Sequence, residues 1–108
     1  MTKVVFYKNK NGNIFGFKAT GHASDMEKGI DIYCAAISAI TQTACIGLND
    51  VVKAKLDLKI NDGFLSAYVS QKDAENENCQ IIFKTLNLGL KSFDEGNPGY
   101  IQIFEEVQ

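Results

Sequence analysis

The chain has 108 residues, of which 45% are apolar and 22% are charged, and its formal net charge is −2. This size and composition are typical of one globular domain with its own core, so we expect residues 1–108 to form a single domain. All 11 basic residues are lysine. Without arginine or a net positive charge, the sequence does not favour a direct nucleic-acid partner.

No continuous apolar run approaches the roughly 20 residues that span a bilayer, so no membrane partner is expected. The N-terminal segment predicts a strand rather than a signal peptide, and a cytoplasmic location is the default expectation. The three cysteines, Cys34, Cys45 and Cys79, form no C-x-x-C pair, and the chain has one histidine. These counts predict neither a disulfide scaffold nor a metal site, and we expect no cofactor.

Two strands joined by a tight turn are predicted at the start of the chain. Val4 and Phe6 mark the first strand, residues 14–19 form the second, and the Asn-Gly sequence within residues 9–13 is typical of a hairpin turn. A polar stretch after His22 has neither helical nor strand periodicity, so we expect a loop there.

A helix is predicted from Ile32 to about Lys53, because apolar residues recur there at helical spacing. Asp31 is a natural N-cap, which puts Cys34 at the third helical position, inside the first turn. The unpaired backbone N–H groups at that end of a helix favour a thiolate and can stabilise an oxyanion.

The second half of the chain predicts a hairpin, a helix and a last strand. Residues 56–60 and 64–69 flank an Asp-Gly turn, a helix begins near Asp73, and residues 100–104 form the final strand. The predicted order is ββαββαβ. The expected fold class is therefore α+β, with a mainly antiparallel sheet and two helices packed on one face.

His22 is the only histidine, and it lies twelve positions before Cys34. A neutral imidazole within reach of a thiol can take its proton and later return it to a leaving amine, so the two residues are a candidate nucleophile–base pair. The alternatives are an exposed loop histidine and a buried structural cysteine. Burial is what we expect for Cys45 and Cys79, which fall on apolar helix faces.

Three further residues near this pair each allow two interpretations. Asp31 either only caps the helix or also orients His22, and a carboxylate so close to Cys34 disfavours the thiolate. Ser38, one turn after Cys34, either bonds back to the Cys34 carbonyl or contacts substrate. Gly21, at the start of the polar loop, either provides turn geometry or acts as the hinge of a lid.

Two segments of the chain resemble the signature of the bacterial ribosomal-processing cysteine proteases, the Prp family: Gly21-His22-Ala23 and Gly29-x-Asp31-Ile32-x-Cys34-Ala35-Ala36-x-Ser38. The similarity covers the whole chain in size, order of elements and position of the motif. The chain departs from the family pattern at Tyr33, where a smaller aliphatic residue is usual and where a ring can narrow the substrate groove.

The resemblance implies a cysteine endopeptidase that removes a short N-terminal extension from a large-subunit ribosomal protein. The expected partner is then the N-terminal peptide of that precursor. The resemblance implies Cys34 as nucleophile and His22 as base, with supporting or substrate-binding roles for Gly21, Asp31 and Ser38. It also implies a homodimer and a mobile loop between the histidine and the cysteine.

Two other functions stay open at this point. A non-catalytic ribosome-associated binding module would not need an intact Cys–His pair, and the lack of arginine weakens this alternative. A thiol redox sensor based on Cys34 would need a resolving cysteine, but Cys45 falls about 16 Å further along the predicted helix.

Overall fold

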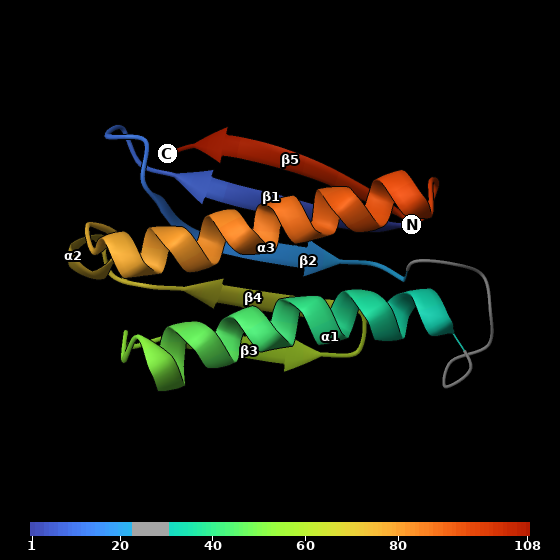
Figure 1. The fold of residues 1–108 in the computed structure, drawn as a ribbon, viewed down its shortest axis with the longest axis horizontal. Coiled ribbons are helices and arrows are strands. Elements are labelled where there is room, and N and C mark those ends of the chain that lie inside the picture. Colours follow the sequence, from blue (N-terminus) through green and yellow to red (C-terminus); the bar gives the residue numbers. More distant parts are fainter. Residues whose placement is uncertain (23–30) are drawn as a thin grey trace.

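The computed structural model describes residues 1–22 and 31–108, which form a five-stranded sheet with helices on one face (Figure 1). In chain order the elements are β1 (Thr2–Lys8), β2 (Ile14–Thr20), α1 (Ile32–Ile46), the π-helical turn η1 (Gly47–Val51), β3 (Asp57–Asn61), β4 (Phe64–Tyr68), α2 (Gln71–Ala74), α3 (Glu77–Gly96) and β5 (Ile101–Val107). The strands lie in the order β3-β4-β2-β1-β5, and of these neighbours β1 and β5 alone are parallel. The predicted ββαββαβ order and mainly antiparallel sheet are confirmed.

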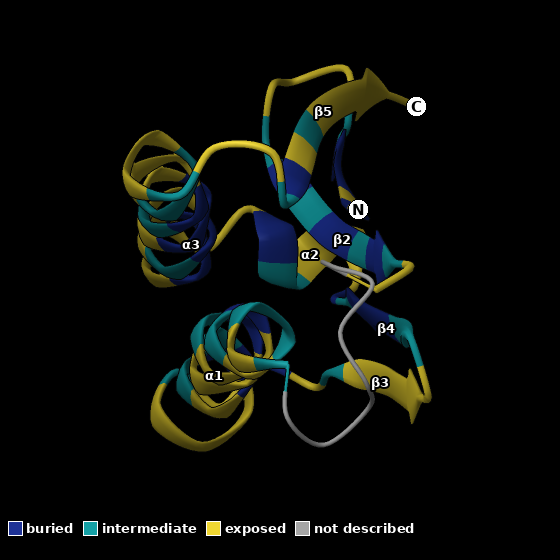
Figure 2. Cartoon of the chain, turned by 90° about the vertical axis from the view of Figure 1, so that its right-hand side faces the viewer, coloured by how far each residue is buried: buried dark blue, intermediate teal, exposed yellow. Residues whose placement is uncertain are grey.

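The helices α1 and α3 lie side by side on the same face of the sheet (Figure 2). The core lies between this helix layer and the sheet. Its largest fully buried side chains come from both layers: Phe6, Phe17, Phe83, Leu48, Leu90, Val4, Thr41 and Cys79. Burial of one large apolar side chain contributes roughly 1.5–3 kcal/mol, so this core is what holds the helices against the sheet.

The single helix predicted to begin near Asp73 is instead two helices, α2 and α3. The Ser70 hydroxyl caps α2 by accepting from the Asp73 N–H at 3.0 Å, and the Asn76 side chain caps α3 by accepting from the Asn78 N–H at 2.8 Å. Because each cap stabilises its own helix start, the chain begins a new helix after α2 rather than continuing the first one. The predicted apolar face is confirmed in α3, where it includes the buried Cys79.

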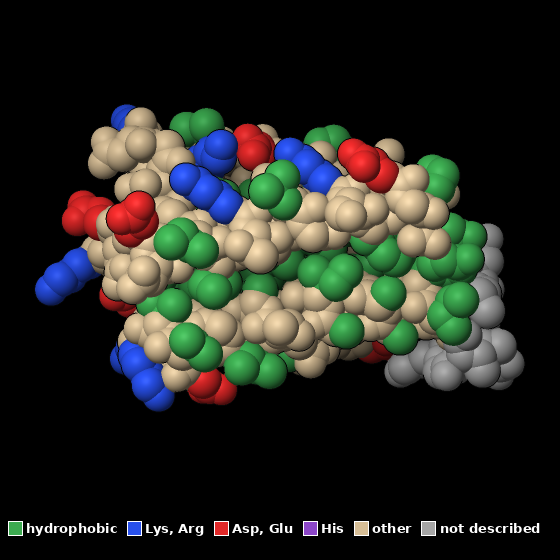
Figure 3. Space-filling view, viewed as in Figure 1, with side chains coloured by type: hydrophobic (Ala, Val, Ile, Leu, Met, Phe, Trp, Pro, Cys, Tyr) green, Lys and Arg blue, Asp and Glu red, His purple; other side chains and the backbone are tan. Residues whose placement is uncertain are grey.

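The first helix continues through η1 to Val51, close to the predicted end at Lys53, which has a φ of 66°. By length and composition alone, the described segment Ile32–Val51 could cross a membrane. This segment is not a continuous apolar run, because polar residues such as Ser38, Thr41 and Gln42 interrupt it, and apolar side chains on its outer face (Figure 3) add to those packed on the sheet. The inner face is buried against the sheet through residues such as Ile37 and Cys45.

One end of the sheet brings together three segments that are distant in sequence. Thr20 at the end of β2 pairs with Phe64 at the start of β4, so β2 ends beside the β3–β4 turn. The Gly21 N–H extends this pairing by donating to the Gly63 carbonyl at 2.9 Å. Since α1 begins over the same end of the sheet (Figure 1), its first turn lies close to His22 and the β3–β4 turn.

Gln80 links the start of α3 to β2 through buried hydrogen bonds. Its Oε1 accepts from the Ile14 N–H at 2.9 Å, and its Nε2 donates to the carbonyls of Ile14 at 2.7 Å and Ala74 at 2.8 Å. These bonds are shielded from water, so the loss of the amide would leave buried backbone groups unsatisfied.

Replacing Gln80 by leucine (Gln80→Leu) nearly keeps the volume but removes all three bonds. We expect the free energy of unfolding to fall by roughly 3 kcal/mol or more, since three buried backbone groups lose a partner and each such loss costs about 1–3 kcal/mol. Urea unfolding followed by circular dichroism measures the change. Gln102→Leu, at an exposed position of β5, is the matched control, and a loss of the same size there would contradict the role of Gln80.

Candidate active site

A hollow of about 740 Å³ lies where the three segments meet. Its walls are the end of β2, the first turns of α1 and the β3–β4 turn. His22 and Cys34 both line it, together with Gly21, Asp31 and Ser38. The structure therefore brings together all five residues that the sequence singled out.

The Cys34 thiol is partly buried at the start of α1, where Cys34 is the third helical residue, as predicted. Its Sγ donates to Asp31 Oδ2 at 3.0 Å, and its backbone N–H donates to Asp31 Oδ1, also at 3.0 Å. A carboxylate that accepts the thiol proton stabilises the thiol over the thiolate.

Asp31 is the predicted N-cap, and its two carboxylate oxygens have different partners. Oδ1 accepts from the backbone N–H groups of Tyr33 at 2.9 Å and Cys34 at 3.0 Å, while Oδ2 holds the thiol. The cap thus takes up two of the N–H groups that a helix start leaves unpaired. N–H groups at this helix start were expected to stabilise an oxyanion. In the structure, the N–H groups of Tyr33 and Cys34 instead donate to Asp31.

The His22 imidazole lies against the β3–β4 turn. Its Nε2 is 3.8 Å from Asp62 Oδ1, a distance at which a protonated ring and a carboxylate form an ion pair. The ring also lies over Gly63, where a built Cβ would be 3.1 Å from Nε2. Among the described residues, the carboxylate paired with His22 is therefore Asp62 and not Asp31.

Within residues 1–22 and 31–108, no hydrogen bond joins His22 to Cys34, because the thiol donates to Asp31. Catalytic hydrogen bonds are often long in unliganded enzymes and tighten when substrate binds. The shared hollow supplies both members of a thiol–imidazole pair. In the described part of the chain, no three His, Cys, Asp or Glu side chains are grouped to hold a metal ion.

Ser38 and Gly21 have different places in the site. Ser38 is exposed, and within the described chain its hydroxyl makes no bond back to the Cys34 carbonyl. Gly21 has a φ of 89°, and a Cβ on it would be 2.7 Å from the Met1 carbonyl oxygen, so turn geometry and close packing account for this glycine. The predicted loop after His22 and its second glycine, Gly29, lie outside the described residues.

Tyr33, the position that departs from the family pattern, does not line the hollow. Its ring stacks on Tyr100, with 3.7 Å between the ring centroids and 10° between the planes. Successive helical residues point about 100° apart, so Cys34 faces the hollow while Tyr33 faces the residue before β5. The Tyr33 ring therefore does not narrow this hollow.

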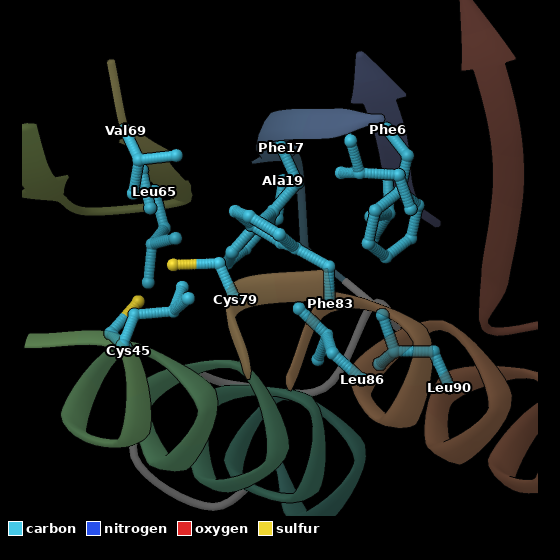
Figure 4. Close-up of a cluster of buried hydrophobic side chains, with 14 of the residues drawn as sticks. Phe6, Phe17, Ala19, Cys45, Leu65, Val69, Cys79, Phe83, Leu86 and Leu90 are labelled. Carbon is cyan, nitrogen blue, oxygen red and sulfur yellow. The ribbon is translucent and has the colours of Figure 1, made fainter. Parts of the chain in front are cut away.

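The other two cysteines are buried in the core, as predicted (Figure 4). Burial raises the pKa of the Cys45 thiol to about 11, and burial, with a smaller contribution from Asp73, raises the pKa of the Cys79 thiol. All three cysteines are free of disulfides. Cys34 is the one that lines the hollow, so it is the thiol that a ligand there would meet.

Asp62 and Gly63 belong to the site but are not predicted from the sequence as site residues. Their Asp-Gly pair signals a turn, and a turn signal does not say what the hairpin packs against. Asp62 and Gly63 reach the site through the antiparallel pairing of β2 with β4, which puts the residues after Thr20 beside those before Phe64.

Comparisons with known proteins show the family of the chain. The sequence model of the family described as cysteine protease Prp matches residues 1–102. The ribosomal processing cysteine protease Prp of Staphylococcus aureus (strain Mu50) is 25% identical over 87 residues, which are 81% of this chain and 82% of the relative.

Solved structures are similar over nearly the whole chain. S. aureus Prp in complex with a covalently linked product peptide has a TM-score of 0.88 at 23% identity, covering 98% of this chain and 100% of that one. SMU.848 from Streptococcus mutans has a TM-score of 0.85 at 26% identity, covering 100% of this chain and 96% of that one.

Replacing Asp31 by asparagine (Asp31→Asn) keeps a side-chain oxygen for the cap but removes the negative charge beside the thiol. We expect iodoacetamide to alkylate Cys34 about tenfold faster at neutral pH, since ~1.4 kcal/mol less repulsion of the thiolate gives that factor. Mass spectrometry measures the rate at each cysteine. Cys45 and Cys79 are internal controls that stay unlabelled in the native protein, and an unchanged rate at Cys34 would show that the carboxylate does not hold the thiol proton.

Proposed function

The chain belongs to the family of the cysteine protease Prp, and from this premise we propose that it removes a short N-terminal extension from a large-subunit ribosomal protein. It is a cysteine protease with a ribosomal processing function. The S. aureus relative has been solved in complex with a substrate peptide and with a covalently linked product peptide. The proposed partner is accordingly the N-terminal peptide of the ribosomal precursor.

The proposed nucleophile is Cys34 and the proposed base is His22. The thiol proton, which lies toward Asp31 at rest, passes to the neutral imidazole, and the sulfur attacks the scissile carbonyl carbon. The peptide C–N bond breaks, and the protonated His22 gives its proton to the leaving amine. Water then hydrolyses the thioester on Cys34, with His22 taking the proton of the water and returning it to the sulfur.

The observation that carries this proposal is the single hollow lined by the only histidine and by the one cysteine outside the buried core. Asp62 supports it, because a carboxylate 3.8 Å from Nε2 stabilises the imidazolium that forms together with the thiolate. We assign Asp31 to positioning the thiol through the cap. We assign the exposed Ser38 hydroxyl to contact with the substrate. We assign Gly21 to the backbone turn that precedes His22.

We also propose a homodimer that acts in the cytoplasm without direct contact to nucleic acid. Apolar side chains gather along the junction of α1 and α3 on the outer face of the helix layer (Figure 3). Large exposed side chains on α1, η1 and α3 include Ile32, Ile46, Val51, Ile81 and Leu88. A second copy would remove such a surface from water. The net charge of −2 and the absence of arginine argue against a nucleic-acid partner.

Gly63→Ala tests whether His22 must lie over the β3–β4 turn. Gly63 has a φ of 66°, and the added Cβ would press on the imidazole at 3.1 Å from Nε2. We expect kcat/KM to fall about tenfold or more, since a displacement of ~1 Å costs up to about a hundredfold.

Gly12→Ala is the matched control for this variant. Gly12 has a φ of 84°, but nothing lies within 4 Å of an added Cβ. It therefore shares the backbone strain, roughly 1–2 kcal/mol, without touching the site. Equal losses of activity in the two variants, measured on a peptide substrate, would contradict the position assigned to His22.

The proposed function is tested with the ribosomal protein precursor encoded in the same genome. Mass spectrometry of the product is expected to show a shortened N-terminus after incubation with the wild type. Cys34→Ala and His22→Ala should lower the rate by more than about a thousandfold, whereas Cys79→Ala, at a buried position that lines neither hollow, should retain it. Ribosome binding without any cleavage by the wild type would instead support the non-catalytic binding module.

A further inference from the structure

A second hollow of about 370 Å³ continues the first one along β3. Residues of α1 and η1 form one wall, and residues of β3 form the other. Gln42 and Ile60 line both hollows, so the two are parts of one groove that leads from Cys34 along the helix-facing side of β3. We refer to the part beside β3 as the β3 groove.

The strand β3 is an edge of the sheet, and among the described strands it pairs with β4 alone. All five of its residues are exposed. An edge strand directs alternate N–H and C=O groups outward, and an extended peptide can pair with them as an added strand. Leu58 and Ile60 point into the β3 groove and are 41% and 50% exposed, so apolar surface is available to alternate side chains of such a peptide.

Carboxylates line both parts of the groove. Asp31 and Asp62 line the part around Cys34, and Asp50 lines the β3 groove. None of the described residues that line either hollow is a lysine, and Lys59 alternates with Leu58 and so faces the other side of the sheet. These charges favour a cationic peptide and disfavour an acidic one.

We propose that the outer edge of β3 and the β3 groove bind an extended, positively charged stretch of the substrate next to the cleaved bond, which adds a strand to the sheet. The inference rests on the proposed peptidase function and specifies how the substrate is held. The five residues of β3 span about 16 Å, enough for four or five substrate residues. Hydrogen bonds between the two backbones hold the peptide. Leu58, Ile60 and the aspartates of the groove determine which peptide side chains fit.

Leu58→Lys tests the β3 groove, with a synthetic peptide that spans the cleavage site of the ribosomal precursor. A lysine there repels a cationic peptide and removes an apolar contact, so KM should rise about tenfold while kcat stays nearly unchanged. Val107→Lys is the matched control, because Val107 is an exposed apolar residue on β5, the opposite edge of the sheet. The alkylation rate of Cys34 should equal that of the wild type in both variants, which shows that the site is intact.

A second measurement leaves the protein unchanged. Single backbone amides of the same peptide are N-methylated in turn, and cleavage by the wild type should fall with a period of two residues on one side of the cleaved bond. An unchanged KM in Leu58→Lys, or N-methyl effects without that period, would overturn the inference and leave the peptidase function standing. If the wild type cleaves neither the peptide nor the precursor, the proposed function itself is wrong.

Discussion

The carboxylate of Asp31 decides where α1 begins, and the geometry of the site depends on that start. One oxygen caps the helix through the N–H groups of Tyr33 and Cys34, and the other accepts the Cys34 thiol. An N-cap contributes about 1 kcal/mol to a helix, but here it also sets the direction in which the sulfur leaves the backbone. A helix start shifted by one residue would turn the thiol by about 100°, away from the hollow and toward the position that Tyr33 now takes.

The imidazole is placed by the sheet rather than by a helix. The ladder between β2 and β4 continues past Thr20 through the hydrogen bond from the Gly21 N–H to the Gly63 carbonyl. His22 follows directly, so its position over the β3–β4 turn depends on strand register. A packed core behind the sheet resists any slip of that register, because a one-residue shift would turn every buried side chain outward. Thiol and imidazole thus stand on two different elements that the same core holds together.

The features that could be predicted from the sequence are those that depend on neighbouring residues. The Asn-Gly and Asp-Gly hairpins, the Asp31 cap and the burial of Cys45 and Cys79 follow from local spacing, and the structure confirms them. The features that were missed depend on distant partners. The direction of Tyr33 depends on Tyr100, and the place of Asp62 beside His22 depends on the order of strands.

The split between α2 and α3 is a different case, because its signals were local. Ser70 and Asn76 are both good capping residues, and each begins its own helix. Apolar spacing in α3 is strong enough to predict a helix but does not show where the helix starts. The pairing of His22 with Cys34 was predicted from a motif rather than from periodicity, since helical or strand spacing alone does not bring a strand end to a helix start.

The charges around the sulfur affect both its reactivity at rest and its response to substrate. Asp31 accepts a hydrogen bond from the thiol, a contact that disfavours the thiolate, and Asp62 and Asp50 are further carboxylates along the same groove. A bound cationic peptide would offset these charges, and the exclusion of water would strengthen the effect. The Asp31 carboxylate that restrains the proposed nucleophile is then also part of the surface proposed to bind the substrate.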